Sequence, residues 1–137
     1  MPNKQNRPLH YGLYGEKDFL LPDFMHCETI ELSIKKLNYT IKEHIHNSLF
    51  QFFIIESGKL DFVIEGVLHI VKAPAVVIIP ENTLHGMKTS KVIRGKVLTI
   101  STSFLETLFW NSPQALVEFS STHLITQFEK PGDFEKA

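Results

Sequence analysis

Short apolar segments recur along residues 28–101, and turn-forming residues separate them. Residues 49–56 form an almost continuous apolar run, as expected for a strand that is covered on both faces. Leu60, Phe62 and Ile64 occupy alternate positions and give the next segment one apolar face. The turn signals between such segments are Ser57-Gly58, Glu65-Gly66, Ala73-Pro74, Pro80-Glu81-Asn82 and Thr89-Ser90. Strands about 8–12 residues apart, with turns between them, predict a mostly β fold, either a sandwich or a barrel.

The two ends of this β region are predicted from local patterns. Ile30, Leu32 and Ile34 alternate with polar residues, which predicts a half-buried strand over residues 30–34. After Thr99 the alternation gives way to helical spacing, and a serine within 101–103 can cap a helix. The chain is therefore expected to end its β region near residue 101 and to continue as short helices.

A chain of 137 residues corresponds to one domain, because a second core would need roughly another 100 residues. Proline and glycine interrupt residues 1–24 too often for a long element, so this segment is expected to be an arm that packs on the domain or on a partner. The remaining predicted parts are a β-barrel over 25–101, a helical, dimerising segment over 102–128, and a tail or linker over 129–137.

Composition excludes several classes of protein. A formal net charge of −1 argues against a generic nucleic-acid binder, which needs a basic excess to neutralise phosphates. One cysteine cannot form an internal disulfide or a cysteine-based zinc site. No apolar run approaches about 18 residues and the start is polar, so neither a membrane span nor a signal peptide is predicted. We expect a cytoplasmic protein.

Three histidines are the candidate metal ligands. His44 and His46 are two residues apart in an extended segment, so their side chains leave the same face. His85 follows a proline-containing turn, where a strand would re-enter the sheet. Three imidazoles can hold a divalent metal such as Zn, Fe, Mn or Ni, with Gln51 as a fourth ligand. The alternative for an isolated His-x-His is a pair that is exposed or joined by hydrogen bonds.

The spacing of these residues resembles the two cupin motifs. The first cupin motif has Gly, five residues, His-x-His, three or four residues, Glu, six residues and Gly. Here Asn38, His44-Ile45-His46, Gln51 and Gly58 stand at those positions. The second motif is matched by Pro80, Asn82 and His85, with Thr89 at the place of its Asn and Pro74 at the place of its first Gly. The resemblance implies a cupin-like double-stranded β-helix, or jelly-roll barrel. Gln51 in place of Glu supplies a weaker ligand for a hard cation.

A second resemblance covers most of the chain. The segments 13–16, 26–30 and 44–51, with Pro80, His85-Gly86 and residues 97–100, are similar to the amino-terminal sensor domain of AraC-type transcriptional regulators. The similar branch controls catabolism of hydroxylated aromatic acids. This resemblance implies a barrel that binds a small effector, with a hydroxylated aromatic acid as the candidate. It also implies a carboxy-terminal DNA-binding domain with two helix-turn-helix units, which is absent from this chain.

Alternate residues of a strand share one face, and this pattern suggests which side chains line the pocket. An aromatic-lined pocket with imidazoles at one end suits a small aromatic carboxylate, which a charged imidazole would pair with. Arg94 and Lys96 are an alternative anion clamp. Tyr11 and Tyr14 of the arm are candidates to cover the pocket mouth. The predicted ligand-binding residues are His44, His46, Gln51, Phe53, Phe62, His85, Met87 and Leu98.

Three functions follow from these observations. The favoured one is a non-enzymatic sensor and dimerisation domain of an AraC-type regulator, with Phe104, Leu108 and Leu116 at the dimer face. The alternative is a metal-dependent cupin enzyme, a dioxygenase or an isomerase, that acts on a small acid. A third is a cupin that binds a sugar or an acid without a regulatory partner.

Overall fold

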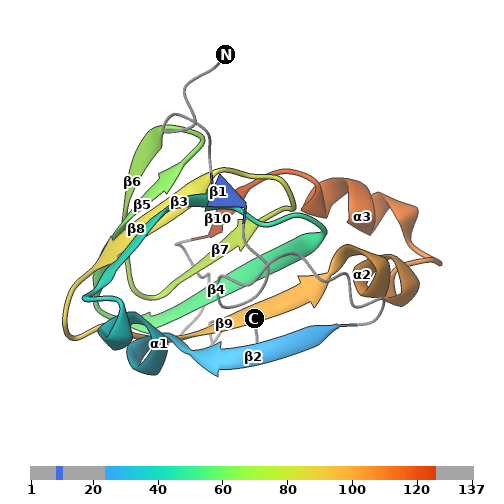
Figure 1. The fold of residues 1–137 in the computed structure, drawn as a ribbon. Helices are drawn as coiled ribbons and strands as arrows, with labels where there is room; N and C mark the ends of the chain where they lie inside the picture. The colour runs from blue at the N-terminus through green and yellow to red at the C-terminus, as the bar shows by residue number, and fades with distance from the viewer. Residues whose placement is uncertain (1–8, 11–23, 126–137) are drawn as a thin grey trace, which may run out of the picture.

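Two five-stranded sheets face each other in the computed structural model, which describes residues 9–10 and 24–125 (Figure 1). One sheet has the strand order β1-β3-β8-β5-β6 and the other the order β10-β7-β4-β9-β2. From β1 to β9 consecutive strands alternate between the sheets, as in a jelly roll, except for the hairpin of β5 and β6 within the first sheet. The expected mostly β barrel is confirmed. The first sheet is made of β1 (Leu9–His10), β3 (Thr40–Ile45), β5 (Lys59–Ile64), β6 (Val67–Lys72) and β8 (His85–Thr89). The second contains β2 (Met25–Thr29), β4 (Leu49–Ser57), β7 (Ala75–Ile79), β9 (Arg94–Ser101) and β10 (His123–Ile125).

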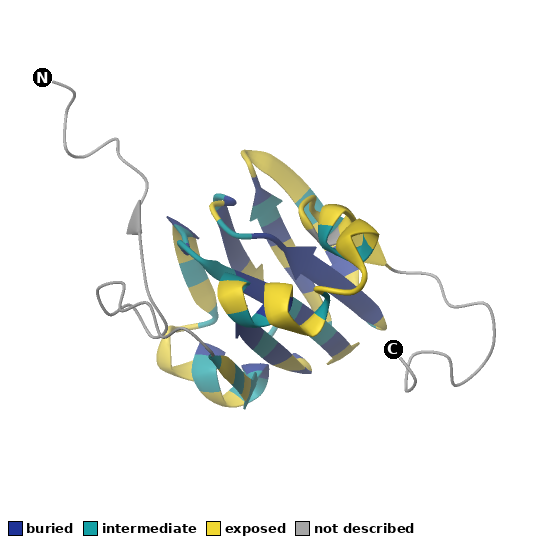
Figure 2. Ribbon diagram, turned by 90° about the vertical axis from the view of Figure 1, so that its right-hand side faces the viewer, coloured by how far each residue is buried: buried dark blue, intermediate teal, exposed yellow. Residues whose placement is uncertain are grey.

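The main core lies between the two sheets (Figure 2). Alternate residues of each strand point inward, and Phe62, Ile55, Leu60 and Val77 are at most 1% exposed. In β4 the inward residues include Phe53 and Ile55, as the period-2 pattern predicts. These side chains fill the barrel interior with apolar groups.

Helix α1 (Ile30–Lys36) replaces the strand that alternation predicts over 30–34. Ile30 and Ile34 are buried in the main core, whereas Leu32 is 70% exposed. Two buried residues four apart lie on one face of a helix, and the basic last turn is favourable at its carboxyl end. The strand prediction was wrong because a spacing of four satisfies both periodicities, and burial against the core decides between them.

Two helices follow the barrel, as expected. Helices α2 (Thr102–Leu108) and α3 (Pro113–Phe119) lie on the outer side of the second sheet, over a smaller cluster of Phe50, Ile100 and Leu105. The Ser101 hydroxyl caps α2 by accepting a hydrogen bond from the Phe104 amide at 3.2 Å. The segment predicted as helical then returns to the barrel, because β10 pairs antiparallel with β7. No helix of the described part is both long and apolar enough to cross a membrane.

Candidate functional site

The structure brings His44, His46 and His85 together at one end of the barrel. His44 lies in β3, His46 follows this strand, and His85 opens the neighbouring β8, directly opposite His44. All three are buried, with exposed fractions of 6%, 8% and 2%. One ring nitrogen from each lies within 4.8 Å of the others.

A bulge in β3 is what turns His44 inward. Ile41 packs against the core and pairs with Met87, while His44 pairs with His85. Residues three apart in a regular strand face opposite sides of the sheet, so both can point inward only where the register shifts between them. Gly86 makes room for this bulge, because a Cβ atom there would lie 2.8 Å from the Glu43 amide nitrogen and 2.9 Å from the Ile41 carbonyl oxygen.

Gln51 reaches the same site from the opposite sheet. It is 8% exposed on β4, and its Oε1 lies 3.0 Å from His85 Nε2. Its Nε2 donates to the Thr99 hydroxyl oxygen at 3.4 Å. Thr99 is 1% exposed and stands directly opposite Gln51 in the β4–β9 register. The site therefore joins both sheets.

Backbone carbonyls fix the orientation of two imidazoles. His44 Nδ1 lies 2.7 Å from the Lys42 carbonyl oxygen, and His85 Nδ1 lies 2.8 Å from the Thr83 carbonyl oxygen. A carbonyl can only accept, so each Nδ1 carries a hydrogen and donates it. In the neutral rings the lone pair is then on Nε2, which is the nitrogen that points into the cluster.

Two of the imidazoles, those of His44 and His85, are held in their neutral form. Burial above all, together with the neighbouring His44 and His46, lowers the pKa of His85 to about 3, although the hydrogen bond to the Thr83 carbonyl acts in the opposite direction. Burial also lowers the pKa of His44. Neutral imidazole is the form that binds metal ions. The predicted pairing of a charged imidazole with a carboxylate is therefore disfavoured at neutral pH.

In the His85–Gln51 contact, two hydrogen-bond acceptors face each other. Neutral His85 presents the lone pair of Nε2 to Gln51 Oε1, which is also an acceptor. Two acceptors 3.0 Å apart repel each other unless a cation or a donor group lies between them, or unless the amide turns to present Nε2. The site thus favours a cation or a hydrogen-bond donor over a bare anion.

The donor set fits a divalent metal ion. His44 Nε2 and His46 Nε2 are 2.9 Å apart. Two nitrogens about 2.1 Å from one ion, at a right angle, would be separated by about 3.0 Å. His85 Nε2 and Gln51 Oε1 face the same cluster, so three imidazoles and one amide oxygen are available as ligands.

Aromatic side chains close the site on its core side. The Phe62 ring stacks on His85 with centroids 6.2 Å apart, and Phe53 lies 6.3 Å from His85. The two phenylalanines also contact each other edge to face at 5.1 Å. Together with buried Met87 they exclude water, which explains the low pKa of His85.

Other predicted pocket residues lie elsewhere. Leu98 faces outward, packed against the cluster beneath the helices, because Val97 and Thr99 are the residues of β9 that point inward. Arg94 and Lys96 are exposed on that outer face, where Lys96 Nζ lies 4.0 Å from Glu56 Oε1, so neither serves as an anion clamp in the interior. The predictions for Leu98 and for the pair Arg94 and Lys96 were wrong because the apolar pattern of β9 does not show which alternate residues face the interior. Tyr11 and Tyr14 lie outside the described residues.

The sequence did not point to Thr83 or Thr99. Thr99 could have been recognised from the alternation of β9, where it follows inward Val97 by two residues. Thr83 acts through its backbone carbonyl, which carries no sequence signal. A separate groove of about 320 Å³ lies on the outer face of the first sheet, where its lining includes Lys42, Asp61 and Lys88 but none of the three histidines.

The sequence profile of the Cupin domain family matches residues 33–101, which hold all three histidines and Gln51. No curated protein matches the chain. A structure of ToxT from Vibrio cholerae is similar with a TM-score of 0.54 and 16% identity, over 82% of this chain and 45% of ToxT. An apo form of a ToxT variant from Vibrio cholerae gives 0.50 and 16%, over 88% and 46%.

The chain thus spans less than half the length of the ToxT structures that it matches. At 16% identity, the likeness concerns the fold alone. A salicylate 1,2-dioxygenase from Pseudaminobacter salicylatoxidans is similar at a TM-score of 0.41 and 16% identity, over 66% of this chain and 23% of the dioxygenase. That likeness carries no information on function.

Proposed function

The chain belongs to the cupin family, and from this membership we propose that it is the effector-binding domain of an AraC-type transcriptional regulator. The observation that carries the proposal is the buried cluster of three imidazoles with Gln51 inside an apolar barrel. Such a site can recognise a polar group on a small molecule while the barrel excludes water. ToxT, a member of the AraC family, shares the fold, which supports this assignment.

We propose a small aromatic acid as the effector. Neutral imidazoles do not attract a carboxylate by charge, so the acid would be received through a divalent cation held by His44, His46 and His85, with Gln51 as the fourth ligand. When bound, the cation supplies the positive charge that an acidic ligand requires. Phe53, Phe62 and Met87 would form the apolar wall behind it. Imidazole nitrogens suit Zn, Fe or Ni, and Mn is the fourth candidate.

Titration calorimetry tests this proposal. Zinc is added first to metal-free protein, and salicylate is then titrated with and without zinc. We expect one zinc per chain, salicylate binding that needs zinc, and loss of both in His85→Ala. His123→Ala, which changes an imidazole away from the cluster, should bind like the wild type. Salicylate binding that is independent of both zinc and His85 would contradict the site.

The domain would also dimerise. Regulators that read paired half-sites need a dimer, and DNA would be bound by the carboxy-terminal domain that the AraC-type resemblance implies. Leu108, Trp110 and Val117 on the helical segment are 54%, 74% and 70% exposed, so they offer an apolar surface to a second copy. Phe104 and Leu116, which we predicted at the dimer face, pack instead against the cluster beneath the helices.

A metal-dependent enzyme is the second candidate function. The 2.9 Å separation of two imidazole nitrogens favours it, because a cation held by three histidines can keep open positions for a substrate. The two functions differ in the fate of the acid. An acid recovered unchanged from iron- or manganese-loaded protein in air indicates a sensor, whereas its conversion indicates an enzyme.

A further inference from the structure

The start of α2 is hydrogen-bonded to the two loops that lie next to the histidines in the sequence. The Thr102 amide donates to the Ser48 carbonyl at 2.8 Å, and Ser48 follows His46 by two residues. The Thr102 hydroxyl donates to Glu81 Oε2 at 2.7 Å. Glu81 belongs to the loop of residues 80–84, which joins β7 to His85 at the start of β8. Thr102 of α2 thus contacts both chain segments that lie next to the histidines, one at Ser48 and one at Glu81.

The 80–84 loop is in turn attached to the imidazole cluster. His85 Nδ1 donates to the Thr83 carbonyl at 2.8 Å, and the Asn82 amide donates to the His46 carbonyl at 2.9 Å. The Thr83 hydroxyl donates to the Glu81 carbonyl at 3.4 Å. A continuous series of contacts therefore leads from His85 and His46 through this loop to Thr102.

The contact between Glu81 and Thr102 is the side-chain step in this series. A hydroxyl that donates to a carboxylate forms a short, charge-assisted hydrogen bond, stronger than a neutral one. Both residues are only partly exposed. Ser101, the residue before Thr102, is 4% exposed; its amide donates to the Phe24 carbonyl at 2.8 Å, and its hydroxyl accepts from the Phe24 amide at 3.0 Å. These contacts fix the position of the first turn of α2 relative to the 80–84 loop. A shift of that loop would therefore be transmitted to α2 through the Glu81–Thr102 hydrogen bond.

We propose that the Glu81–Thr102 hydrogen bond couples occupancy of the histidine cluster to the position of α2 and α3. The inference rests on the proposed function, because it requires a site that fills and empties. An occupant that draws the imidazoles toward itself changes the contacts of His85 with Thr83 and of His46 with Asn82, and the loop passes this change to Thr102. Since coupling is reciprocal, a change at α2 alters affinity at the cluster by the same factor.

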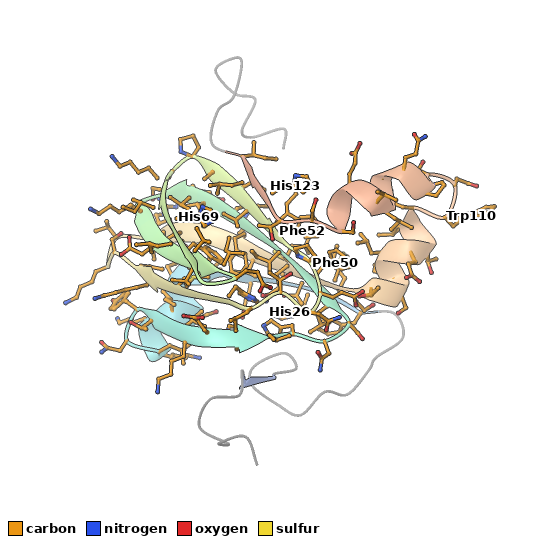
Figure 3. All side chains as sticks on the ribbon, turned by 90° about the horizontal axis from the view of Figure 1, so that it is seen from above. His26, Phe50, Phe52, His69, Trp110 and His123 are labelled. Carbon is orange, nitrogen blue, oxygen red and sulfur yellow. The ribbon has the colours of Figure 1, made fainter. Side chains whose placement is uncertain are left out.

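Trp110 provides the readout. It is the only tryptophan of the chain, it lies just beyond α2, and it is 74% exposed at the outer end of the helical segment (Figure 3). The probe is zinc alone, titrated into metal-free protein, with binding followed by calorimetry and Trp110 followed by fluorescence. Amide hydrogen exchange of residues 102–108 gives a second measure of the same helix.

In the wild type, zinc should shift Trp110 emission and slow exchange in α2. Thr102→Val removes the hydroxyl and keeps the shape of the side chain. It should still bind one zinc, with an affinity altered by no more than about five-fold, but lose the response of Trp110 and of α2. Glu81→Gln should weaken the response in the same direction, and it serves if Thr102→Val does not fold.

Thr107→Val is the matched control, because the Thr107 hydroxyl donates only within α2, to the Ser103 carbonyl at 3.0 Å. It should respond to zinc like the wild type. A full zinc response in both Thr102→Val and Glu81→Gln would overturn the coupling and leave the proposed site intact. Zinc binding to the wild type without any response of Trp110 or α2 would also overturn it. Absence of zinc binding to the wild type, seen in the calorimeter, would overturn the proposed metal site and the coupling together.

Discussion

At the scale of single residues, His85 shows how burial determines chemistry. Its ring lies between Phe62, Phe53 and two other imidazoles, and one nitrogen donates to a backbone carbonyl. A charged ring would lose its hydration there without gaining an anionic partner among the described residues. The site therefore uses histidine as a neutral lone-pair donor, not as a cation.

The low pKa of His85 predicts that stability decreases in acid. The unfolded residue binds its proton near pH 6.5 and the folded one only near pH 3, so between these values the unfolded state holds more protons. The free energy of unfolding should fall as the pH drops through this window, by up to about 1.4 kcal/mol per pH unit, and the lowered pKa of His44 acts in the same direction. Urea unfolding at several pH values between 7 and 5 measures this slope.

His85→Gln should flatten that slope, and His123→Gln should leave it unchanged. An equal slope in the wild type and in His85→Gln would show that the histidine cluster does not account for acid sensitivity.

Gln51 sets the strength of the cation site. Gln51→Glu places a carboxylate 3 Å or so from His85, and a hard cation prefers a carboxylate to an amide oxygen. Zinc affinity should rise by about ten-fold or more in calorimetry. Gln51→Met, which offers no oxygen, should bind zinc more weakly than the wild type. Equal affinities in all three proteins would mean that residue 51 does not contact the ion.

At the scale of elements, the two ends of the barrel are closed differently. Helix α1 packs Ile30 and Ile34 into the core near Gly95 and Ile55, where β4 ends and β9 begins. Gln51, at the start of β4, marks the opposite end, where the histidines lie. The end covered by α1 therefore stabilises the fold, whereas the opposite end carries the polar groups that can bind a ligand or a metal ion.

A pair of substitutions in α1 tests whether the end of the barrel that this helix covers stabilises the fold. Ile34 is 1% exposed, and Ile34→Ala should lower the free energy of unfolding by about 2–5 kcal/mol because it leaves a cavity in the core. Leu32→Ala, at a residue 70% exposed in the same helix, should cost less than about 0.5 kcal/mol. Urea midpoints at pH 7.5 report both values. Comparable losses would indicate that α1 does not seal the core as described.

At the scale of the whole molecule, the helical segment is largely exposed (Figure 2). Its exposed apolar residues Leu108, Trp110 and Val117 form an apolar surface. It is attached to the outer face of one sheet through Leu105, Phe104 and Leu116, so it extends from the barrel without closing it. A second copy is the occupant that we propose for this surface.

Sedimentation equilibrium at tens of micromolar protein tests the dimer. The wild type should be dimeric, and the double variant Leu108→Glu, Val117→Glu should shift to monomer because it places charges in the apolar contact. Ile70→Glu changes a residue that is 65% exposed on β6 of the other sheet, and should leave the dimer unchanged. A monomeric wild type would contradict the dimer, and a monomeric Ile70→Glu variant would move the interface to β6.

The sequence by itself determined the features that are encoded locally. Alternation and turn residues indicated the strands, Phe53 and Phe62 were assigned to the inner face, and the spacing of the histidines predicted the cupin family, whose profile matches residues 33–101. These patterns are readable because each strand has a period of two and each turn is a short-range preference.

Only the tertiary structure decided the features that depend on register. The β3 bulge turns His44 inward, burial makes α1 a helix, and the parity of β9 selects Thr99 instead of Leu98 for the interior. Each depends on a partner that is distant in sequence, such as Gly86 for the bulge and Gln51 for Thr99. A shift of one residue between strands exchanges the two faces of a sheet, and no local pattern specifies that shift.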